Sequence, residues 1–209
     1  MISVALPKGR IAEETLSIFE KIFDKKFIFE DRRLILKKDD FTFLLVRNQD
    51  VPTYVLHQAA DIGVVGLDVL SEKELDLVDL LDLKIGKCKV CVGMKNEDKL
   101  DLNKPSIKVA TKMENIARKY FSSKAMAAEI IKLYGSIELA PIVGMCDAIV
   151  DIVETGTTMK QNGLKVVETI MDSSAHLIAN KNSFISKKSE ILSLYEKISK
   201  VICPNHTKE

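Results

Sequence analysis

One carboxylate and a run of hydroxyl side chains stand together in the second half of the chain. Asp151 lies in the apolar segment 149–153, and the next five residues are Glu154, Thr155, Gly156, Thr157 and Thr158. Successive backbone N–H groups around a glycine can converge on an anion, and threonine hydroxyls add donors without adding charge. A nearby carboxylate repels a bare phosphate but accepts hydrogen bonds from ribose hydroxyls. The pattern therefore predicts a sugar-phosphate site, and the alternative is an ordinary turn that caps a helix.

Two cations flank a glycine near the start of the chain. Lys8, Gly9 and Arg10 follow the apolar run 2–6, which predicts a strand. Open α/β sheets bind ligands at the carboxyl ends of their strands, where the next helix begins. With a helix N-terminus behind them, the two basic side chains can hold a pyrophosphate group. A solvated basic turn is the alternative interpretation.

A third group of candidates follows two further apolar runs. Arg47 comes directly after the expected strand 41–46, so it is a cation just past the end of a strand, like Arg10. Gly66 follows the run 62–65 and permits a tight turn or a close approach of the backbone to a ligand. Asp68 can face a ligand or cap the helix from Val69 onward, and we expect capping.

The other residue types that often do chemistry form no site in this sequence. His57 has no adjacent carboxylate for a dyad, so we expect a surface or partly packed side chain. Cys88 and Cys91 are spaced like a metal or redox pair, but they lie in an apolar run typical of a short strand. No Ser-His-Asp or metal triad can be assembled, and we expect no metal site made by side chains alone. The absence of a G-x-x-x-x-G-K-[S/T] motif disfavours a P-loop nucleotide hydrolase.

Short β-rich runs alternate with helical stretches, which indicates an α/β fold with largely parallel sheets. The expected strands are 2–6, 41–46, 62–65, 89–92, 107–110, 137–140 and 149–153. Helices are expected after Arg10, from the N-cap Asp50 onward, over 114–134 with an interruption near residues 122 and 123, and over about 187–202 before Pro204.

The composition favours a globular protein without a broad charged surface. The chain has 209 residues, 46% of them hydrophobic, and its 31 basic and 30 acidic residues give a formal charge of +1. That balance offers no electrostatic footprint for nucleic acid or for an anionic membrane. The first residues form no secretion signal and no apolar run approaches the ~20 residues of a membrane-spanning helix, so we expect a cytoplasmic protein. Gly86, Gly93 and the polar stretch 95–104 indicate where one lobe gives way to another, and two lobes would create a cleft.

Four segments together resemble the short form of the ATP phosphoribosyltransferase family. They are LPKGR at 6–10, RNQDVPTYV at 47–55, ADIGVVGLDVL at 60–70 and ELAPIVGMCDAIVDIVETGTTMKQNGL at 138–164. The resemblance implies transfer of the phosphoribosyl group of phosphoribosyl pyrophosphate to N1 of ATP, with release of pyrophosphate and with Mg²⁺ assisting at the substrate phosphates. This reaction opens histidine biosynthesis.

The resemblance also assigns roles to the candidate residues. The loop 154–158 would hold the 5′-phosphate, and Asp151 would address the ribose hydroxyls. Lys8, Arg10 and Arg47 would lie around the pyrophosphate and the nucleotide phosphates. Catalysis would come from positioning and charge stabilisation, without a covalent nucleophile.

The family's fold implies two periplasmic-binding-protein-like lobes with a cleft between them and a chain that crosses twice. Residues 1–86 and 168–209 would form the first lobe, and residues 87–167 the second lobe with the phosphoribosyl pyrophosphate loop. One departure is the segment 111–115, Thr-Lys-Met-Glu-Asn, where many relatives have T-x-Y-P-N.

Two other functions stay open as alternatives. A two-lobed module can bind a small ligand or regulate without catalysis, but a secreted receptor would carry a targeting segment and a regulator would carry a DNA-binding module. A nucleobase-salvage phosphoribosyltransferase would have an adjacent acidic pair before its loop, whereas Ile152 and Val153 follow Asp151.

The resemblance also implies a protein partner. Little chain follows the last expected helix, so we expect no histidine-sensing domain. Short-form relatives are accompanied by a regulatory subunit that resembles histidyl-tRNA synthetase. We therefore expect a hetero-oligomer, or a homodimer when the chain is alone.

Overall fold

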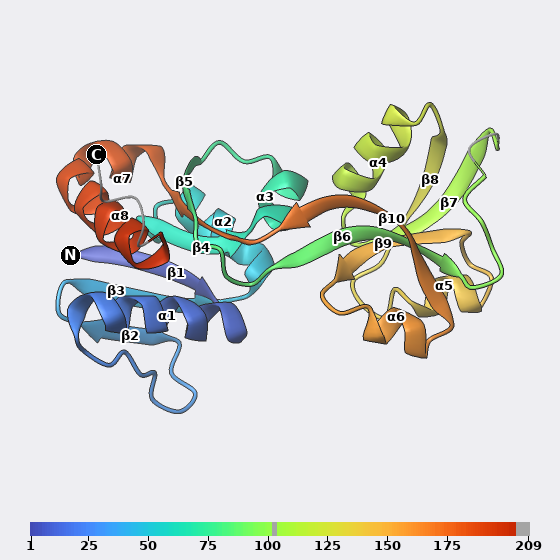
Figure 1. Cartoon of the computed structure of the whole chain (residues 1–209). Coiled ribbons are helices and arrows are strands. Elements are labelled where there is room, and N and C mark those ends of the chain that lie inside the picture. Colours follow the sequence, from blue (N-terminus) through green and yellow to red (C-terminus); the bar gives the residue numbers. More distant parts are fainter. Residues whose placement is uncertain (102–103, 204–209) are drawn as a thin grey trace. The chain divides into compact units, whose positions relative to one another are not determined.

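The chain divides into two compact units in the computed structural model, which describes residues 1–101 and 104–203. One unit contains Met1–Leu70, Glu74–Gly86 and the chain from Ser174 onward, and the other contains Ser71–Lys73 and Lys87–Ser173. The chain thus leaves the first unit after Gly86 and returns at Ser174 (Figure 1). From the sequence we expected the chain to pass between the lobes after residues 86 and 167. The assignment of functions to the two lobes stays a prediction.

The first unit is built on one mixed sheet. Its elements, with the first part of α3, are β1 (Ile2–Pro7), α1 (Arg10–Phe23), β2 (Ile35–Lys38), β3 (Phe41–Val46), the 3-10 helix η1 (Asn48–Asp50), α2 (Val51–Leu56), β4 (Ile62–Gly66), α3 (Leu67–Lys73), β5 (Val78–Asp82), β11 (Ala175–Ala179), α7 (Lys181–Ser186) and α8 (Lys188–Ile202). The strand order among the described residues is β2-β3-β1-β4-β11-β5. β1 is parallel to β3 and β4, whereas β2, β11 and β5 pair antiparallel.

The second unit holds another mixed sheet. Its elements are β6 (Cys88–Lys95), β7 (Ser106–Thr111), α4 (Glu114–Ser123), β8 (Ala127–Lys132), α5 (Leu139–Ile142), β9 (Ala148–Val153), α6 (Thr157–Gln161) and β10 (Leu164–Ser173). The strand order in the described chain is β10-β6-β9-β7-β8. β7 is parallel to β8 and β9, and β6 is antiparallel to β9 and β10.

Both faces of each sheet carry a hydrophobic core, which explains the uninterrupted apolar runs in the sequence. In β1, Val4 and Leu6 belong to the cluster that contains Phe19 of α1, whereas Ala5 belongs to the cluster that contains Val51 of α2. In the second unit, α4 contributes to one cluster, and α5 and α6 contribute to the other. The helices therefore cover the sheets from both sides, as α/β architecture requires.

Two expected elements are wrong, and the sheets are mixed where we expected them to be largely parallel. The segment expected as a strand over 137–140 leads into α5, where Pro141 has no N–H to give to a strand ladder. The helix expected over 114–134 ends at Ser123, because Ala125 adopts a left-handed φ of 56° and the chain then pairs as β8 with β7. The other expected strands are confirmed, with bounds that differ by a few residues.

The remaining helices occur close to their expected positions. Asp50 is the N-cap of α2, although its side chain makes no capping hydrogen bond. α8 buries Ile191, Leu194 and Ile198, which belong to the apolar stripe that predicted it. Pro204, which we expected to stop this helix, lies outside the described residues. Within the part of the chain that the structure describes, no helix is both long enough and apolar enough to cross a membrane.

Candidate active site

The carboxylate selected from the sequence lies on β9, the central strand of the second sheet. Asp151 alternates with Val150 and Ile152, so it shares the face of the sheet that carries Ile149, Val153 and α6. Its Oδ1 accepts a hydrogen bond of 2.8 Å from the Ile152 N–H. Its side chain is 22% exposed, so it remains accessible to a ligand.

The loop after β9 forms a small cavity with hydroxyl groups at its rim. The cavity measures about 350 Å³ and is lined by residues 152–159. Gly156 takes the left-handed conformation, with φ 76°, and is the N-cap of α6. The hydroxyls of Thr155 and Thr157 lie 2.9 Å apart, and both side chains are exposed, as are those of Glu154 and Thr158. The expected loop residues are therefore gathered around one hollow, which can accept a phosphate-sized anion.

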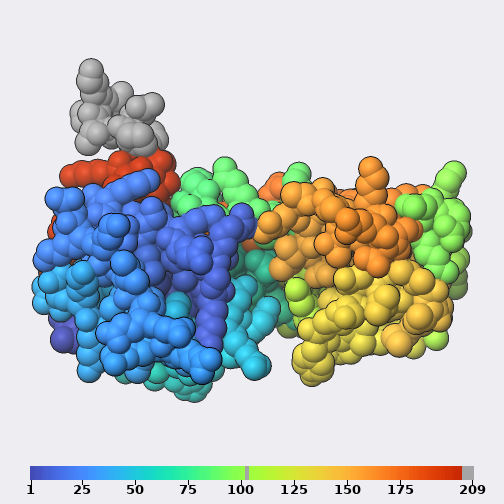
Figure 2. All heavy atoms as spheres, turned by 90° about the horizontal axis from the view of Figure 1, so that it is seen from below, coloured from blue at the N-terminus to red at the C-terminus, as the bar shows by residue number. Residues whose placement is uncertain are grey.

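One buried side chain anchors this loop to the sheet. Met159 is 6% exposed and belongs to the same core cluster as Ile149 of β9. A Cβ on Gly93 of β6 would lie 3.1 Å from the Met159 sulfur, so the glycine leaves the room that this side chain needs. The Asn162 side chain donates to the Thr158 carbonyl at 2.9 Å. The segment of α6, orange in Figure 2, lies on the surface of the second unit.

The cations selected from the sequence lie in the first unit. Parallel pairing sets Pro7 of β1 opposite Val46 of β3, and the Lys8 N–H donates to the Val46 carbonyl at 2.9 Å. Lys8 and Arg47 therefore leave neighbouring strands at the same edge of the sheet, and both are exposed. Arg47 directly precedes η1, for which it is the N-cap.

Gly9 and Arg10 form the turn from β1 into α1. Gly9 has φ 99° and is the N-cap, and a Cβ there would meet no atom within 4 Å. The glycine is thus required by its backbone conformation rather than by crowding. The Arg10 Nε lies 3.8 Å from Glu14 Oε1, one turn along the exposed surface of the helix. Arg10 is therefore the first residue of α1, and its guanidinium is turned along the helix towards Glu14.

Gly66 and Asp68 lie against each other, but Asp68 does not have the capping role that we expected. α3 begins at Leu67 with Gly66 as its N-cap, so the prediction that Asp68 caps the helix from Val69 onward is wrong. Asp68 is instead 3% exposed within the first turn. A Cβ on Gly66 would lie 2.2 Å from Asp68 Oδ1, which means that the carboxylate lies over the glycine backbone. Gly66 ends β4, which is parallel to β1, so it lies at the same sheet edge as Lys8.

Sequence reasoning missed one charged residue beside Asp151. The Lys112 Nζ lies 3.3 Å from Asp151 Oδ1, and its side chain is 33% exposed. The pairing of Thr111 with Val150 brings the end of β7 level with Asp151. A cation just past the end of a strand was the signal that found Arg47, and it would have found Lys112 once β7 was placed next to β9.

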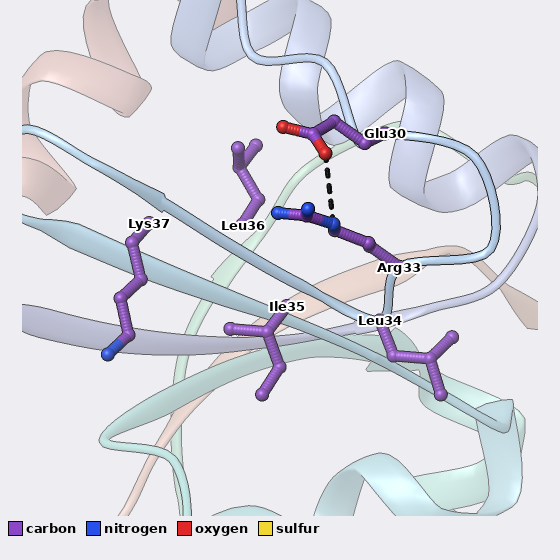
Figure 3. A pocket seen from close by; sticks show the side chains of 6 residues that line it. All are labelled: Glu30, Arg33, Leu34, Ile35, Leu36 and Lys37. Carbon is purple, nitrogen blue, oxygen red and sulfur yellow. Dashed lines mark ion pairs between the residues drawn. The ribbon is translucent and has the colours of Figure 1, made fainter.

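Other features of the sequence lie outside this arrangement. Cys88 and Cys91 are on β6, as the strand interpretation predicted. His57 is exposed after α2. A further cavity of about 560 Å³ is lined by Glu30 and residues 33–37, with an ion pair of 2.9 Å between Arg33 and Glu30 (Figure 3). None of the candidate residues from the sequence lines this cavity.

The architecture is that of two-lobed ligand-binding proteins. The periplasmic aliphatic sulphonate binding protein SsuA from Escherichia coli has a TM-score of 0.63 and 11% identity, over 95% of this chain and 71% of that chain. An amino-acid ABC transporter extracellular-binding protein, ytmK from Bacillus subtilis, has a TM-score of 0.56 and 12% identity, over 98% of this chain and 97% of that chain. At these identities the likeness shows the fold alone. The fold and the loop after β9 together define a two-lobed α/β protein with a small, hydroxyl-lined cavity in its second unit.

Closer relatives narrow this class to one family. The model of the HisG family, ATP phosphoribosyltransferase, matches residues 47–200. The ATP phosphoribosyltransferase of Campylobacter fetus subsp. fetus is 72% identical over 202 residues, which are 97% of this chain and 100% of that protein. In the ATP phosphoribosyl transferase (HisG:HisZ) complex from Thermotoga maritima, one chain has a TM-score of 0.84 and 35% identity, over 97% of this chain and 98% of that chain. The chain belongs to the ATP phosphoribosyltransferase family.

Proposed function

We propose that this chain is the catalytic subunit of an ATP phosphoribosyltransferase. It transfers the phosphoribosyl group of phosphoribosyl pyrophosphate (PRPP) to N1 of ATP and releases pyrophosphate, which is the first step of histidine biosynthesis. The observation that carries the proposal is the 72% identity with an ATP phosphoribosyltransferase over nearly the full length of both chains. The solute-binding proteins share only the fold, at 11–12% identity.

The loop after β9 suits the sugar-phosphate half of PRPP. In our proposal the loop 154–158 surrounds the 5′-phosphate, with backbone N–H groups and the hydroxyls of Thr155, Thr157 and Thr158 as donors. Asp151 accepts hydrogen bonds from the ribose hydroxyls. The left-handed conformation at Gly156 supports this assignment, because it turns the chain sharply at the rim of the cavity.

The cations of the first unit suit the more highly charged groups. We assign Lys8, Arg10 and Arg47 to the pyrophosphate and the nucleotide phosphates. Their positions at one sheet edge support this role, since such an edge is where α/β proteins bind ligands. Gly9, where an added Cβ would meet no atom within 4 Å, allows the backbone to approach the substrate closely, whereas Gly66 leaves room for the buried Asp68 carboxylate.

The proposed reaction is a displacement at the anomeric carbon of the ribose. The bond from this carbon to the pyrophosphate oxygen breaks, and the electron pair leaves with pyrophosphate. The lone pair on adenine N1 forms the new bond. Positive charge develops on the sugar between these events, and a fixed carboxylate such as Asp151 stabilises it electrostatically. Lys8, Arg10 and Arg47 stabilise the negative charge on the leaving group.

A magnesium ion fits this site as a companion of the substrate. Mg²⁺ is commonly bound through one or two carboxylates together with substrate phosphates. Among the described residues, no group of three or more His, Cys, Asp or Glu side chains is placed to hold a metal ion by itself. Glu154 is the carboxylate of the loop segment that would complete the coordination of an ion carried on the substrate, since Asp151 is assigned to the ribose hydroxyls. When bound, the ion would neutralise charge on the leaving group.

We further propose that the chain works with a regulatory subunit in the cytoplasm. The Thermotoga maritima protein was solved as a HisG:HisZ complex, and it covers 97% of this chain. A subunit that resembles histidyl-tRNA synthetase would supply regulation and complete a hetero-oligomer. PRPP and ATP are substrates of cytoplasmic metabolism, which supports the location.

The test is an assay of the chain with ATP, PRPP and Mg²⁺, with and without the regulatory subunit. Mass spectrometry should find one phosphoribosyl group added to ATP, and one pyrophosphate should appear for each product molecule. Binding of PRPP without any product, in the presence of the partner, would instead support a binding module. Turnover of a free nucleobase in place of ATP would support the salvage alternative.

A further inference from the structure

Lys112 and Asp151 form an ion pair at the edge of the proposed PRPP site. The Nζ–Oδ1 distance is 3.3 Å, and the two side chains are 33% and 22% exposed. The same oxygen accepts the hydrogen bond from the Ile152 N–H. Within the described chain, the second oxygen of Asp151, Oδ2, has no hydrogen-bond partner. The carboxylate is therefore held by one oxygen and open at the other.

The backbone before Lys112 is fixed to β9, and the backbone after it is tied to the same threonine, Thr111. Thr111 is fully buried, and its hydroxyl donates to the Val150 carbonyl at 2.6 Å. The same hydroxyl accepts a hydrogen bond of 2.9 Å from the Met113 N–H, and Met113 is 2% exposed in the core below α4. Lys112 thus projects from a rigid bend that is attached one residue before Asp151.

This setting differs from that of other lysine pairs on the same sheet. Lys108 of β7 lies 3.6 Å from Glu129 of β8, and these side chains are 57% and 62% exposed. Such exposed pairs contribute little, because water and salt screen them. The pair at Asp151 is more enclosed and lies beside the candidate ligand loop, so its geometry has consequences for binding.

We propose that Lys112 is a positioning residue that holds Asp151 by Oδ1 and presents Oδ2 to the ribose hydroxyls. The inference rests on the proposed function, since it takes the loop 154–158 as a sugar-phosphate site. Without the lysine, the Ile152 N–H alone holds the carboxylate, which can then rotate. Its uncompensated charge would also repel the phosphate in the loop. Both effects weaken binding of a ribose phosphate.

The experiment measures the binding of ribose 5-phosphate and 2-deoxyribose 5-phosphate by calorimetry. Wild-type protein should prefer the ribose form, because only that form offers the 2-hydroxyl to Asp151. Lys112→Met should lose roughly five- to tenfold in affinity for ribose 5-phosphate, and it should lose most of the preference between the two sugars. Lys112→Arg should restore both. Lys108→Met is the matched control and should bind like wild type.

A second comparison tests whether Lys112 acts through Asp151. In an Asp151→Asn background, adding Lys112→Met should change the affinity less than twofold, because coupled residues are not additive. If Lys112→Met weakens the binding of both sugar phosphates equally, and does so in the Asp151→Asn background as well, then Lys112 contacts the phosphate directly. That result would overturn the proposal. If Lys112→Met does not fold, as judged by its melting curve, Lys112→Gln is measured in the same way.

The outcomes also separate this inference from the proposed function. Wild-type protein that binds neither sugar phosphate nor PRPP would contradict the sugar-phosphate site, and the role of Lys112 with it. Wild-type protein that binds ribose 5-phosphate, with a Lys112→Met variant that matches it, would overturn the role of Lys112 alone.

Discussion

Gly156 is the residue at which a single methyl group should disturb the phosphate loop most selectively. Its φ of 76° and ψ of 1° lie in the left-handed region. An added Cβ would meet only Val153 Cγ1, at 3.8 Å, which is ordinary van der Waals contact. The penalty for Gly156→Ala is therefore conformational and amounts to about 1–2 kcal/mol.

The penalty should appear in ligand binding rather than in folding. Thr155 and Thr157 on either side are exposed, so the loop can relax without opening the core. Its backbone N–H groups then no longer converge, and PRPP must restore the strained conformation when it binds. At about 1.4 kcal/mol per factor of ten, the dissociation constant of PRPP should rise roughly five- to thirtyfold.

Gly163 supplies the matched control for this substitution. It has a similar φ of 70°, and a Cβ there would meet nothing within 4 Å, but it connects α6 to β10 instead of lining the cavity. Gly163→Ala should lower the melting temperature and leave PRPP affinity unchanged. Gly156→Asn should recover part of the affinity, since Asn tolerates the left-handed region. Calorimetry with PRPP and Mg²⁺ decides: wild-type affinity in Gly156→Ala, or the same loss in both alanine variants, would refute the reasoning.

Three further substitutions test other parts of the molecule. Thr158→Val keeps the shape but removes a donor, and calorimetry should show PRPP binding weaker by about 1.5–3 kcal/mol if this hydroxyl meets the phosphate; unchanged binding would remove Thr158 from the site. Arg10→Ala should weaken pyrophosphate binding by a similar amount, whereas Lys25→Ala, on the same unit, should not; equal affinities would place Arg10 on the solvated surface. For Asp82, burial raises the pKa, but hydrogen bonds led by that from Lys84 outweigh it and lower the pKa from 3.8 to about 2. The stability that the ionised Asp82 contributes is present above pH ~4 and is lost as the pH falls towards ~2. In denaturant unfolding, Asp82→Asn should therefore be about 1–2 kcal/mol less stable than wild type at pH 7 and equal to wild type near pH 2. A difference that does not change with pH would contradict this pKa.

The sequence predicted β1, β3, β4, β6, β7 and β9 because their apolar runs are long and flanked by turns, but it missed β2, β5, β10 and the buried β11. β3 occurs at the expected residues, and β1 and β4 are each one residue longer than expected. β8 was assigned to a helix because its sequence, AAEIIK, suits either structure. Its pairing with β7 decides the outcome, and pairing across the chain leaves no local signal.

In the candidate site, likewise, residues that are adjacent in the sequence could be predicted, whereas residues brought together only by strand pairing could not. The loop 154–158 could be recognised because its residues are contiguous. Lys112 could not be, since its approach to Asp151 depends on β7 lying next to β9. Asp68 was given the wrong role because capping preferences are statistical, and the helix begins two residues earlier than the pattern suggested.

A scaffold shared with solute-binding proteins must gain its chemistry from the residues at its strand ends. The net charge of +1 gives no general attraction for ATP or PRPP, so local placement of cations has to supply it. Lys8 and Arg47 are brought to one edge by the register of β1 against β3. A slip of one residue would turn every side chain of β3 to the other face. Phe41 and Phe43 of that strand pack edge-on against Phe19, with ring centroids 5.3 and 5.2 Å away, and a slip would expose both rings. The aromatic core of the first unit thereby fixes the positions of the two cations, so loss of Phe19 should disturb anion binding as well as stability.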